Sequence, residues 1–117
     1  MDKKSIQVFF PEEELALLEE FKTVSGSSYS HIAEQAILYF IKNDLPYVKE
    51  KYRLYNGLGE KRKSRKQVYI SKPTYEILIR FIAEKNKNPD NDYSVSGLTG
   101  QACMKYLEYI HQLQKNF

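Results

Sequence analysis

Apolar and polar residues alternate in two short runs of this chain, and each run is followed by a proline. The runs are Ile6-Gln7-Val8 and Val68-Tyr69-Ile70, with Pro11 and Pro73 a few residues further on. A period of two places successive side chains on opposite faces, so each run predicts a β-strand. Proline fits the first turn of a helix, where its missing N–H has no partner to lose, so a helix is expected after each strand.

Behind each proline, apolar residues recur at spacings of three and four, which predicts two helices in each half. The first helix breaks at Ser25-Gly26 in one half and at Asn88-Pro89-Asp90 in the other. The second helix is expected to open at Ser28 and at Ser94, because serine is a favoured N-cap. The predicted apolar stripes are Leu17, Leu18, Phe21 and Val24; Ala33, Ile37, Phe40 and Ile41; Tyr75, Leu78, Ile79 and Ile82; and Thr99, Cys103, Tyr106 and Leu107.

The same order of elements occurs twice, which indicates an internal duplication. Aligning Pro11 with Pro73 superimposes the two alternating runs on each other. Aligning Ser28 with Ser94 superimposes the two second helices, but at a larger separation along the chain, so the second half has an insertion in the loop between its helices. Loops tolerate insertions because they run over the surface of a domain.

The duplication divides the chain into a first unit at 1–44, a linker at 45–63 and a second unit at 64–117. Aromatic and apolar residues recur at helical spacing within the linker, which suggests a short additional helix. One unit alone has a single unpaired strand and too little apolar surface to be stable. We therefore expect a mainly α-helical fold with a short two-stranded antiparallel ribbon, in which both units share one core as an intramolecular pseudo-dimer.

This order of elements resembles the ribbon-helix-helix family of DNA-binding proteins, the Arc, CopG and MetJ type. The residues that carry the resemblance are the alternating strands, the proline after each strand, and the turn Gly26-Ser27-Ser28 that opens a second helix. Members of that family usually form the ribbon from two chains. A tandem copy within one chain is similar to some relaxosome accessory proteins of conjugative plasmids.

The resemblance implies binding to double-stranded DNA, with the ribbon in the major groove and its outward side chains at the base edges. Since the apolar residues of both runs are expected to face the core, the alternation turns their neighbours outward. The implied base-reading residues are Ser5, Gln7, Phe9, Gln67, Tyr69 and Ser71. Gln7 and Gln67 are the best candidates among them, because a carboxamide pairs with N6 and N7 of adenine.

The resemblance also implies phosphate contacts at the starts of the second helices, where backbone N–H groups and the helix dipole attract anions. The implied phosphate-binding residues are Lys3, Lys4, Ser28, Ser30, Lys66, Lys72, Ser94 and Ser96. Simpler roles stay open, since the serines can act as helix caps only and the outward strand residues can be exposed without a function. Phe9 can either meet a thymine methyl group or fold back into the core.

Charge is distributed unevenly between the two halves. Residues 1–50 contain 5 lysines and 9 acidic residues, whereas residues 51–117 contain 13 basic and 6 acidic residues. The basic run at 61–66, with Lys72, suits either an anionic partner or a solvated linker. The first helix is expected to avoid DNA and to be available to a protein partner, and unlike halves would read an asymmetric DNA site. The acidic residues of that helix are Glu12, Glu13, Glu14, Glu19 and Glu20.

Nothing in the sequence suggests an enzyme, a metal site or a cofactor. His31 and His111 have no second ligand at metal-binding spacing, and the single cysteine, Cys103, lies on an expected core stripe. The chain has no apolar run of about 18 residues and no signal-peptide pattern, so a cytoplasmic location without membrane contact is expected.

Two classes of function remain. The first is a sequence-specific DNA-binding protein that acts as a transcriptional repressor or as a relaxosome accessory factor. Its partners would be double-stranded DNA, further copies of itself on DNA, or a protein such as a relaxase. The alternative is a protein-interaction module of the same fold that has lost DNA binding and uses Phe9, Tyr69 and the acidic helix.

Overall fold

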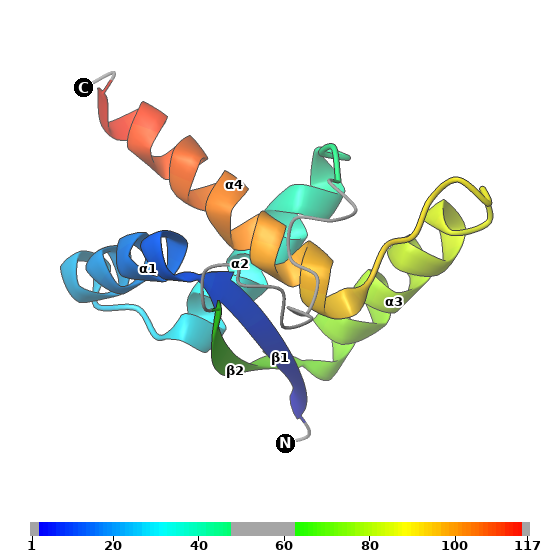
Figure 1. Cartoon of the computed structure of the whole chain (residues 1–117), viewed down its shortest axis with the longest axis horizontal. Coiled ribbons are helices and arrows are strands. Elements are labelled where there is room, and N and C mark those ends of the chain that lie inside the picture. The colour runs from blue at the N-terminus through cyan, green and yellow to red at the C-terminus, as the bar shows by residue number, and fades with distance from the viewer. Residues whose placement is uncertain (1–2, 48–62, 116–117) are drawn as a thin grey trace.

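The computed structural model describes residues 3–47 and 63–115, and these form two strands and four helices (Figure 1). The order along the chain is β1 (Lys3–Pro11), α1 (Glu12–Ser25), α2 (Tyr29–Lys42), β2 (Lys63–Ser71), α3 (Lys72–Lys85) and α4 (Val95–Lys115). The fold is therefore mainly helical with one two-stranded antiparallel sheet, as the periodicity predicts. The predicted linker helix falls largely on residues 48–62, which lie outside the described residues.

β1 and β2 pair antiparallel along their whole length, with Gln7 opposite Gln67 at the centre. All four helices lie on one side of this two-stranded ribbon (Figure 1). The side chains expected to point inward are at most 4% exposed, and these are Ile6, Val8, Val68 and Ile70. The inward assignment of both strands is thus confirmed, because the strand period of two decides which side chains can reach the helices.

The helices meet the inner face of the ribbon in one shared core. α2 and α4 cross each other above it, and each contacts the strand of the opposite half: α2 lies against β2, and α4 against β1. The predicted stripes of these two helices enter the core, since Ala33, Ile37 and Phe40 of α2 are fully buried, as are Thr99 and Cys103 of α4. The two halves are interlocked, so neither half keeps its apolar surface covered without the other.

The helix ends follow from local sequence chemistry. Ser28 caps α2 by accepting a hydrogen bond from the His31 N–H at 3.0 Å, and Ser94 caps α4 by accepting one from the Gly97 N–H at 3.0 Å. Both predicted N-caps are therefore confirmed. Gly26 ends α1 in the left-handed conformation, with φ at 73°, which glycine adopts without the steric cost of a Cβ.

The apolar stripe predicted for the first helix is wrong at two of its four positions. Leu18 is buried and Phe21 is half-buried, but Leu17 is 57% exposed and Val24 is 77% exposed. Successive residues of an α-helix are rotated by about 100°, so Leu17 and Val24, which are two turns apart, share the side that faces solvent. The same error occurs at Ile79 of α3, which is 39% exposed.

The offset between the starts of the corresponding strands and first helices differs from the offset between the two prolines. β1 begins at Lys3 and β2 at Lys63, and the same offset relates the starts of α1 and α3 at Glu12 and Lys72. Pro11 therefore corresponds to Ser71, the N-cap of α3, whereas Pro73 lies in the first turn of that helix. Because the two prolines occupy different helix positions, the proline alignment is wrong by two positions. This error leaves the inward and outward faces unchanged, since strand side chains alternate with a period of two.

Substitution of Leu18 and of its neighbour Leu17 tests the packing of α1. We expect Leu18→Ala to lower the free energy of unfolding by about 2–5 kcal/mol, because it leaves a cavity in the core. Leu17→Ala is the matched control and is expected to change that free energy by no more than about 0.5 kcal/mol, since the side chain is largely in solvent. Urea denaturation followed by circular dichroism measures both, and equal losses would contradict this orientation of α1.

Candidate nucleic-acid interface

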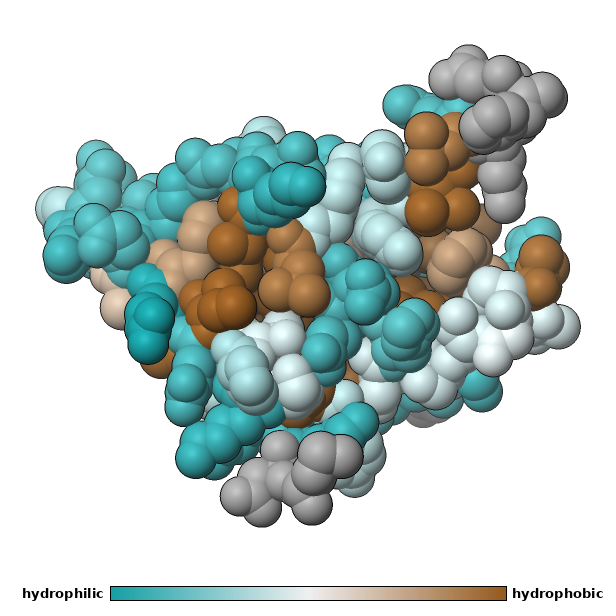
Figure 2. Space-filling model, turned by 180° about the vertical axis from the view of Figure 1, so that it is seen from behind, coloured by the Kyte–Doolittle hydropathy of each residue, from teal (hydrophilic) through white to brown (hydrophobic). Residues whose placement is uncertain are grey.

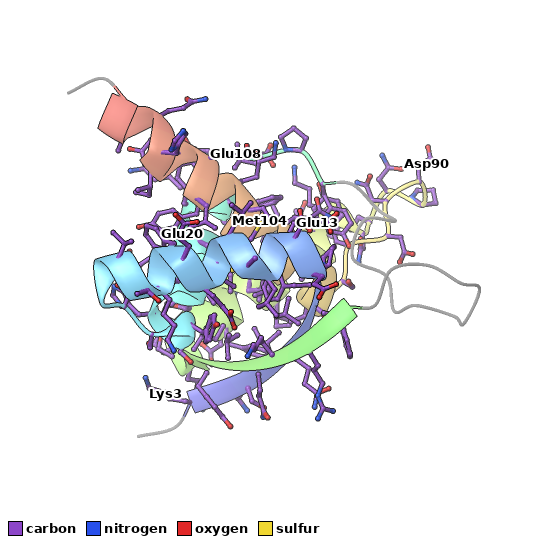
Figure 3. All side chains as sticks on the ribbon, turned by 60° about the vertical axis from the view of Figure 1, so that its left-hand side comes forward. Lys3, Glu13, Glu20, Asp90, Met104 and Glu108 are labelled. Atoms are coloured by element: carbon purple, nitrogen blue, oxygen red, sulfur yellow. The ribbon has the colours of Figure 1, made fainter. Side chains whose placement is uncertain are left out.

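The outer face of the ribbon carries polar and aromatic side chains on the side opposite the helices (Figure 3). The predicted base-reading residues that are exposed on this face are Ser5, Gln7, Gln67 and Tyr69. Phe9 also has outward register but is half-buried, and its neighbour Phe10 fills the core instead. Five of the six predicted base-reading residues therefore share one surface.

Pairing across the ribbon decides which outward side chains are neighbours. The outward pairs are Gln7 with Gln67, Ser5 with Tyr69, and Phe9 with Arg65. Arg65 is exposed, yet sequence reasoning missed it as a base-reading residue, because the alternation in the second strand was followed back only as far as Gln67. Continuing the alternation from Gln67 back by one period of two would have found it. Arginine is the side chain that most often reads guanine in a major groove.

Two serines in the first turns of α2 and α4 attach these helices to the ribbon. The Ser30 hydroxyl accepts a hydrogen bond from the Tyr69 backbone N–H at 2.8 Å, and the Ser96 hydroxyl donates one to the Gln7 carbonyl at 2.6 Å. Each bond joins a helix to the strand of the other half. A hydroxyl has one proton, so Ser96 cannot donate to a phosphate while it donates to Gln7, whereas Ser30 keeps its proton available.

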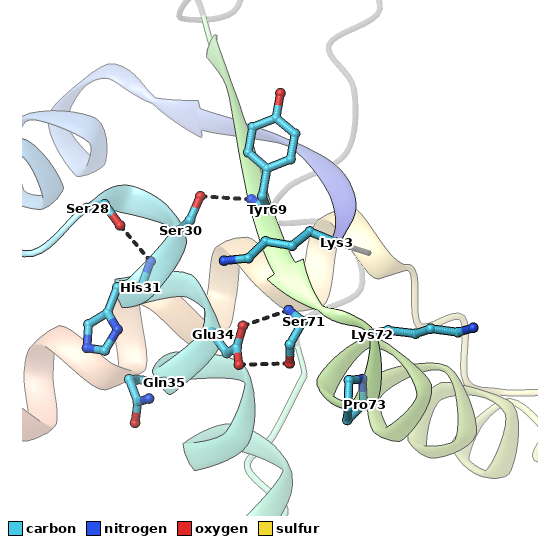
Figure 4. Close-up of a pocket in the computed structure, with 10 residues that line it drawn as sticks. All are labelled: Lys3, Ser28, Ser30, His31, Glu34, Gln35, Tyr69, Ser71, Lys72 and Pro73. Carbon is cyan, nitrogen blue, oxygen red and sulfur yellow. Dashed lines mark hydrogen bonds between the residues drawn. The ribbon is translucent and has the colours of Figure 1, made fainter. Parts of the chain in front are cut away.

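An open pocket lies at the start of α2, beside the end of the ribbon where Lys3 faces Ser71 (Figure 4). It is lined by Lys3, Ser28, Ser30, His31, Glu34, Gln35, Tyr69, Ser71, Lys72 and Pro73. Lys3 extends over the pocket toward α2, whereas the ammonium group of Lys72 points away from it (Figure 4). A helix N-terminus with lysine and serine side chains around it attracts anions, and phosphate groups in particular.

Glu34 joins α2 to the start of α3 within this pocket. Its carboxylate accepts hydrogen bonds from the Ser71 N–H at 2.8 Å, the Ser71 hydroxyl at 3.0 Å and the Thr74 hydroxyl at 3.1 Å. Partial burial acts to raise the pKa of Glu34, but these hydrogen bonds and the charge of Lys3 outweigh it and lower the pKa from its ordinary value. Ser71 also caps α3 by accepting from the Thr74 N–H, so its hydroxyl is engaged with the helices.

The start of α4 differs from the start of α2. The Tyr47 hydroxyl accepts a hydrogen bond from the Ser94 N–H at 3.3 Å, and the Tyr47 ring stacks on Tyr93 with 4.3 Å between ring centroids. A Cβ at Gly97 would lie 2.5 Å from that hydroxyl, so glycine leaves the space that the phenol occupies. When Ser28 is aligned with Ser94, the counterpart of Gly97 in α2 is His31. The two helix starts therefore offer different groups to a ligand.

The four lysines predicted to bind phosphate fall into two pairs. Lys3 and Lys72 are exposed and line the pocket at α2. Lys66 is half-buried on the inner face of the ribbon, with its ammonium group 4.0 Å from the Glu19 carboxylate. Lys4 has inward register as well, although its side chain is exposed. Lys3, whose side chain extends over the pocket, is thus the lysine best placed for an anionic ligand.

Groups suited to metal binding or nucleophilic chemistry do not gather in residues 3–47 and 63–115. No cluster of three or more His, Cys, Asp or Glu side chains there is arranged to hold a metal ion. His31 is exposed at the pocket and His111 is exposed near the end of α4. Cys103 is buried, and this burial raises the pKa of its thiol to about 12, which disfavours the reactive thiolate. None of the helices in these residues has the length and apolar character that crossing a membrane requires.

Apolar surface lies away from the ribbon. Figure 2 shows brown surface on the back of the molecule and near the C-terminal end of α4, whereas hydrophilic residues surround the lower edge, where the ribbon lies. The large apolar residues exposed on the helices are Leu17, Val24, Ile77, Ile79, Tyr109 and Leu113. The outer face of the ribbon is therefore suited to a polar ligand more than to an apolar one.

Comparison with known proteins gave no match to a family model, a curated protein or a solved structure. Function must therefore be inferred from the residues and their geometry.

The hydrogen bonds to Glu34 predict that the free energy of unfolding depends on pH. The pKa of Glu34 in the folded protein lies below its ordinary value of 4.5. The stabilisation by its carboxylate is therefore present above pH 4.5 and is lost as the pH falls through the folded-state pKa. We expect Glu34→Gln to lower the free energy of unfolding by about 1–2 kcal/mol near neutral pH and by clearly less near pH ~3.

Urea denaturation of the wild type and the variant at both pH values measures this difference. Glu76→Gln is the matched control, because Glu76 is an exposed glutamate on α3. A loss for Glu34→Gln that is the same at both pH values would contradict the assigned role of the carboxylate.

Proposed function

We propose that the protein binds double-stranded DNA in a sequence-specific manner, with the β1–β2 ribbon in the major groove. One observation carries this proposal: the outer face of the ribbon is polar, lies opposite all four helices and has Gln7 beside Gln67 at its centre. A two-stranded ribbon fits a major groove about 12 Å wide, and a carboxamide at that depth pairs with N6 and N7 of adenine. The two glutamines are thus the central base-reading pair.

We propose further that the chain is an intramolecular pair of ribbon-helix-helix units related by an approximate twofold axis. An axis between Gln7 and Gln67 would exchange β1 with β2, α1 with α3 and α2 with α4. The equal offset between the two strands and between the two first helices supports this arrangement. So do the crossed contacts, in which α2 lies against β2 and α4 against β1.

The starts of α2 and α4 are proposed to hold the DNA backbone on either side of the ribbon. At α2, the hydroxyls of Ser28 and Ser30 can donate to phosphate oxygens, and Lys3 adds charge. At α4, the hydroxyls of Ser94 and Tyr47 share one hydrogen bond, so one of their two protons is available to a phosphate. Ser96 contributes by holding α4 against β1 rather than by touching phosphate.

The biological role that suits such a protein is repression of transcription or assembly of a plasmid-transfer complex, in the cytoplasm. Both roles need a second surface for further copies or for a protein such as a relaxase. α1 offers one, because Leu17 and Val24 are exposed on a helix rich in glutamate. The same observation favours the second candidate function, a protein-interaction module without DNA binding.

Replacement of the two central glutamines tests the base-reading role. Sites are first selected from a random duplex library, and fluorescence anisotropy then measures affinity for a selected duplex and for a random one. We expect Gln7→Ala combined with Gln67→Ala to weaken binding to the selected duplex by at least roughly 30-fold, because two pairs are lost and each good pair contributes about 1–3 kcal/mol. Binding to random duplex is expected to change little.

Gln112→Ala is the matched control, because Gln112 is an exposed glutamine near the end of α4. Unchanged specificity in the double variant would remove both glutamines from the base-reading role. If the wild type bound neither duplex at low salt, the protein-interaction module would be the better explanation of the fold.

Replacement of Lys3 and Lys72 tests the backbone contacts separately from base reading. We expect Lys3→Ala and Lys72→Ala to weaken binding to all duplexes alike, and each to reduce the slope of log K against log salt by about 1. Lys105→Ala is the charge-matched control, because Lys105 pairs with Glu108, which lies far from the ribbon (Figure 3). A lysine variant that altered the preferred sequence, with the salt slope unchanged, would contradict this assignment.

A further inference from the structure

The proposed axis between Gln7 and Gln67 allows the two ends of the ribbon to be compared residue by residue. When the starts of β1 and β2 are aligned, Ser5 corresponds to Arg65, and Phe9 corresponds to Tyr69. All four have outward register, so they flank the central glutamines on the proposed DNA-facing side. The centre of this surface is therefore symmetric, whereas its flanks are not.

The two ends differ in their capacity to distinguish bases. At one end Arg65 lies across from Phe9, and at the other Ser5 lies across from Tyr69. An arginine side chain presents two parallel N–H donors that match O6 and N7 of guanine. A serine has one hydroxyl on a short side chain, and this hydroxyl can donate to or accept from any base. Only the end with Arg65 has a group that selects one base strongly.

We propose that the protein reads a duplex with two unlike half-sites, in which a guanine beneath Arg65 is the main determinant of specificity. This inference rests on the proposed DNA-binding function and names the kind of site that the ribbon takes. Since one half-site alone carries the guanine, Arg65 also decides the orientation in which the protein binds. A homodimeric ribbon lacks this property, because both of its ends carry the same side chains.

The lysine best placed for a backbone contact lies at the opposite end. Lys3 lies next to the Ser5–Tyr69 end, where the pocket at the start of α2 opens. Tyr69 is 47% exposed and its hydroxyl can reach phosphate, whereas Phe9 offers only an apolar contact suited to a thymine methyl group. Lys3 thus adds charge for the backbone at one end and Arg65 reads a base at the other, so the two ends contribute differently to affinity and to specificity.

Selection from a random duplex library with the full chain tests the inference. The wild type is expected to enrich sites with guanine in one half only. Arg65→Ser gives both ends serine at this position, and we expect it to lose the guanine preference and to bind the selected duplex at least about tenfold more weakly. Arg65→Lys keeps the charge but not the paired donors, so it is expected to keep its affinity for random duplex while losing most of the preference.

A variant with a symmetric ribbon tests the inference by a new binding preference, which misfolding cannot produce. Ser5→Arg combined with Phe9→Tyr gives both ends the same three outward residues, arginine, glutamine and tyrosine. This variant is expected to select palindromic sites with guanine in both halves. Circular dichroism melting of each variant confirms that the fold is retained, since Ser5 is exposed and Phe9 is only half-buried.

The outcomes separate this inference from the function on which it rests. Symmetric sites selected by the wild type, or a guanine preference that survives Arg65→Ser, would overturn the asymmetric site and leave DNA binding intact. No enrichment of any duplex by the wild type would overturn the proposed DNA binding together with the inference.

Discussion

Pairing of β1 with β2 is the interaction on which the rest of this structure depends. An isolated strand leaves its backbone N–H and C=O groups without partners, and each half of the described chain contributes one strand. With Gln7 opposite Gln67, the apolar residues of both strands form a single inner surface. α2 and α4 then cover that surface crosswise, each on the strand of the other half. Each half therefore needs the other half to pair its strand and to cover its apolar surface.

The same pairing leaves one face of the ribbon without helices. A slip of one residue in either strand would turn Gln7 or Gln67 toward the core and an apolar neighbour toward solvent, so burial of the inner face specifies the register strongly. The hydrogen bonds that join Ser30 and Ser96 to the ribbon backbone then set the helix starts beside the ribbon. Geometry at the outer face is thus a consequence of packing on the inner face.

The helix that follows each strand begins with different stabilising side chains. The start of α3 is capped by Ser71, with Glu34 of α2 reaching it from another helix. The start of α1 has no side-chain cap and instead carries three glutamates in its first turn, which interact favourably with the helix dipole. Position 100, which corresponds to Glu34 in the second half, is a glycine. The two first helices are therefore stabilised at their starts by different groups.

The sequence by itself determined the features that depend on near neighbours in the chain. The inner and outer faces of both strands follow from a period of two, and they survive the two-position error of the proline alignment for that reason. The caps at Ser28 and Ser94 follow from hydrogen bonds between residues three positions apart. Tertiary structure alone decided which side of α1 is buried and that Ser71 binds Glu34. Each of these depends on contacts between residues distant in the chain, and no local pattern records which distant partner a side chain will meet.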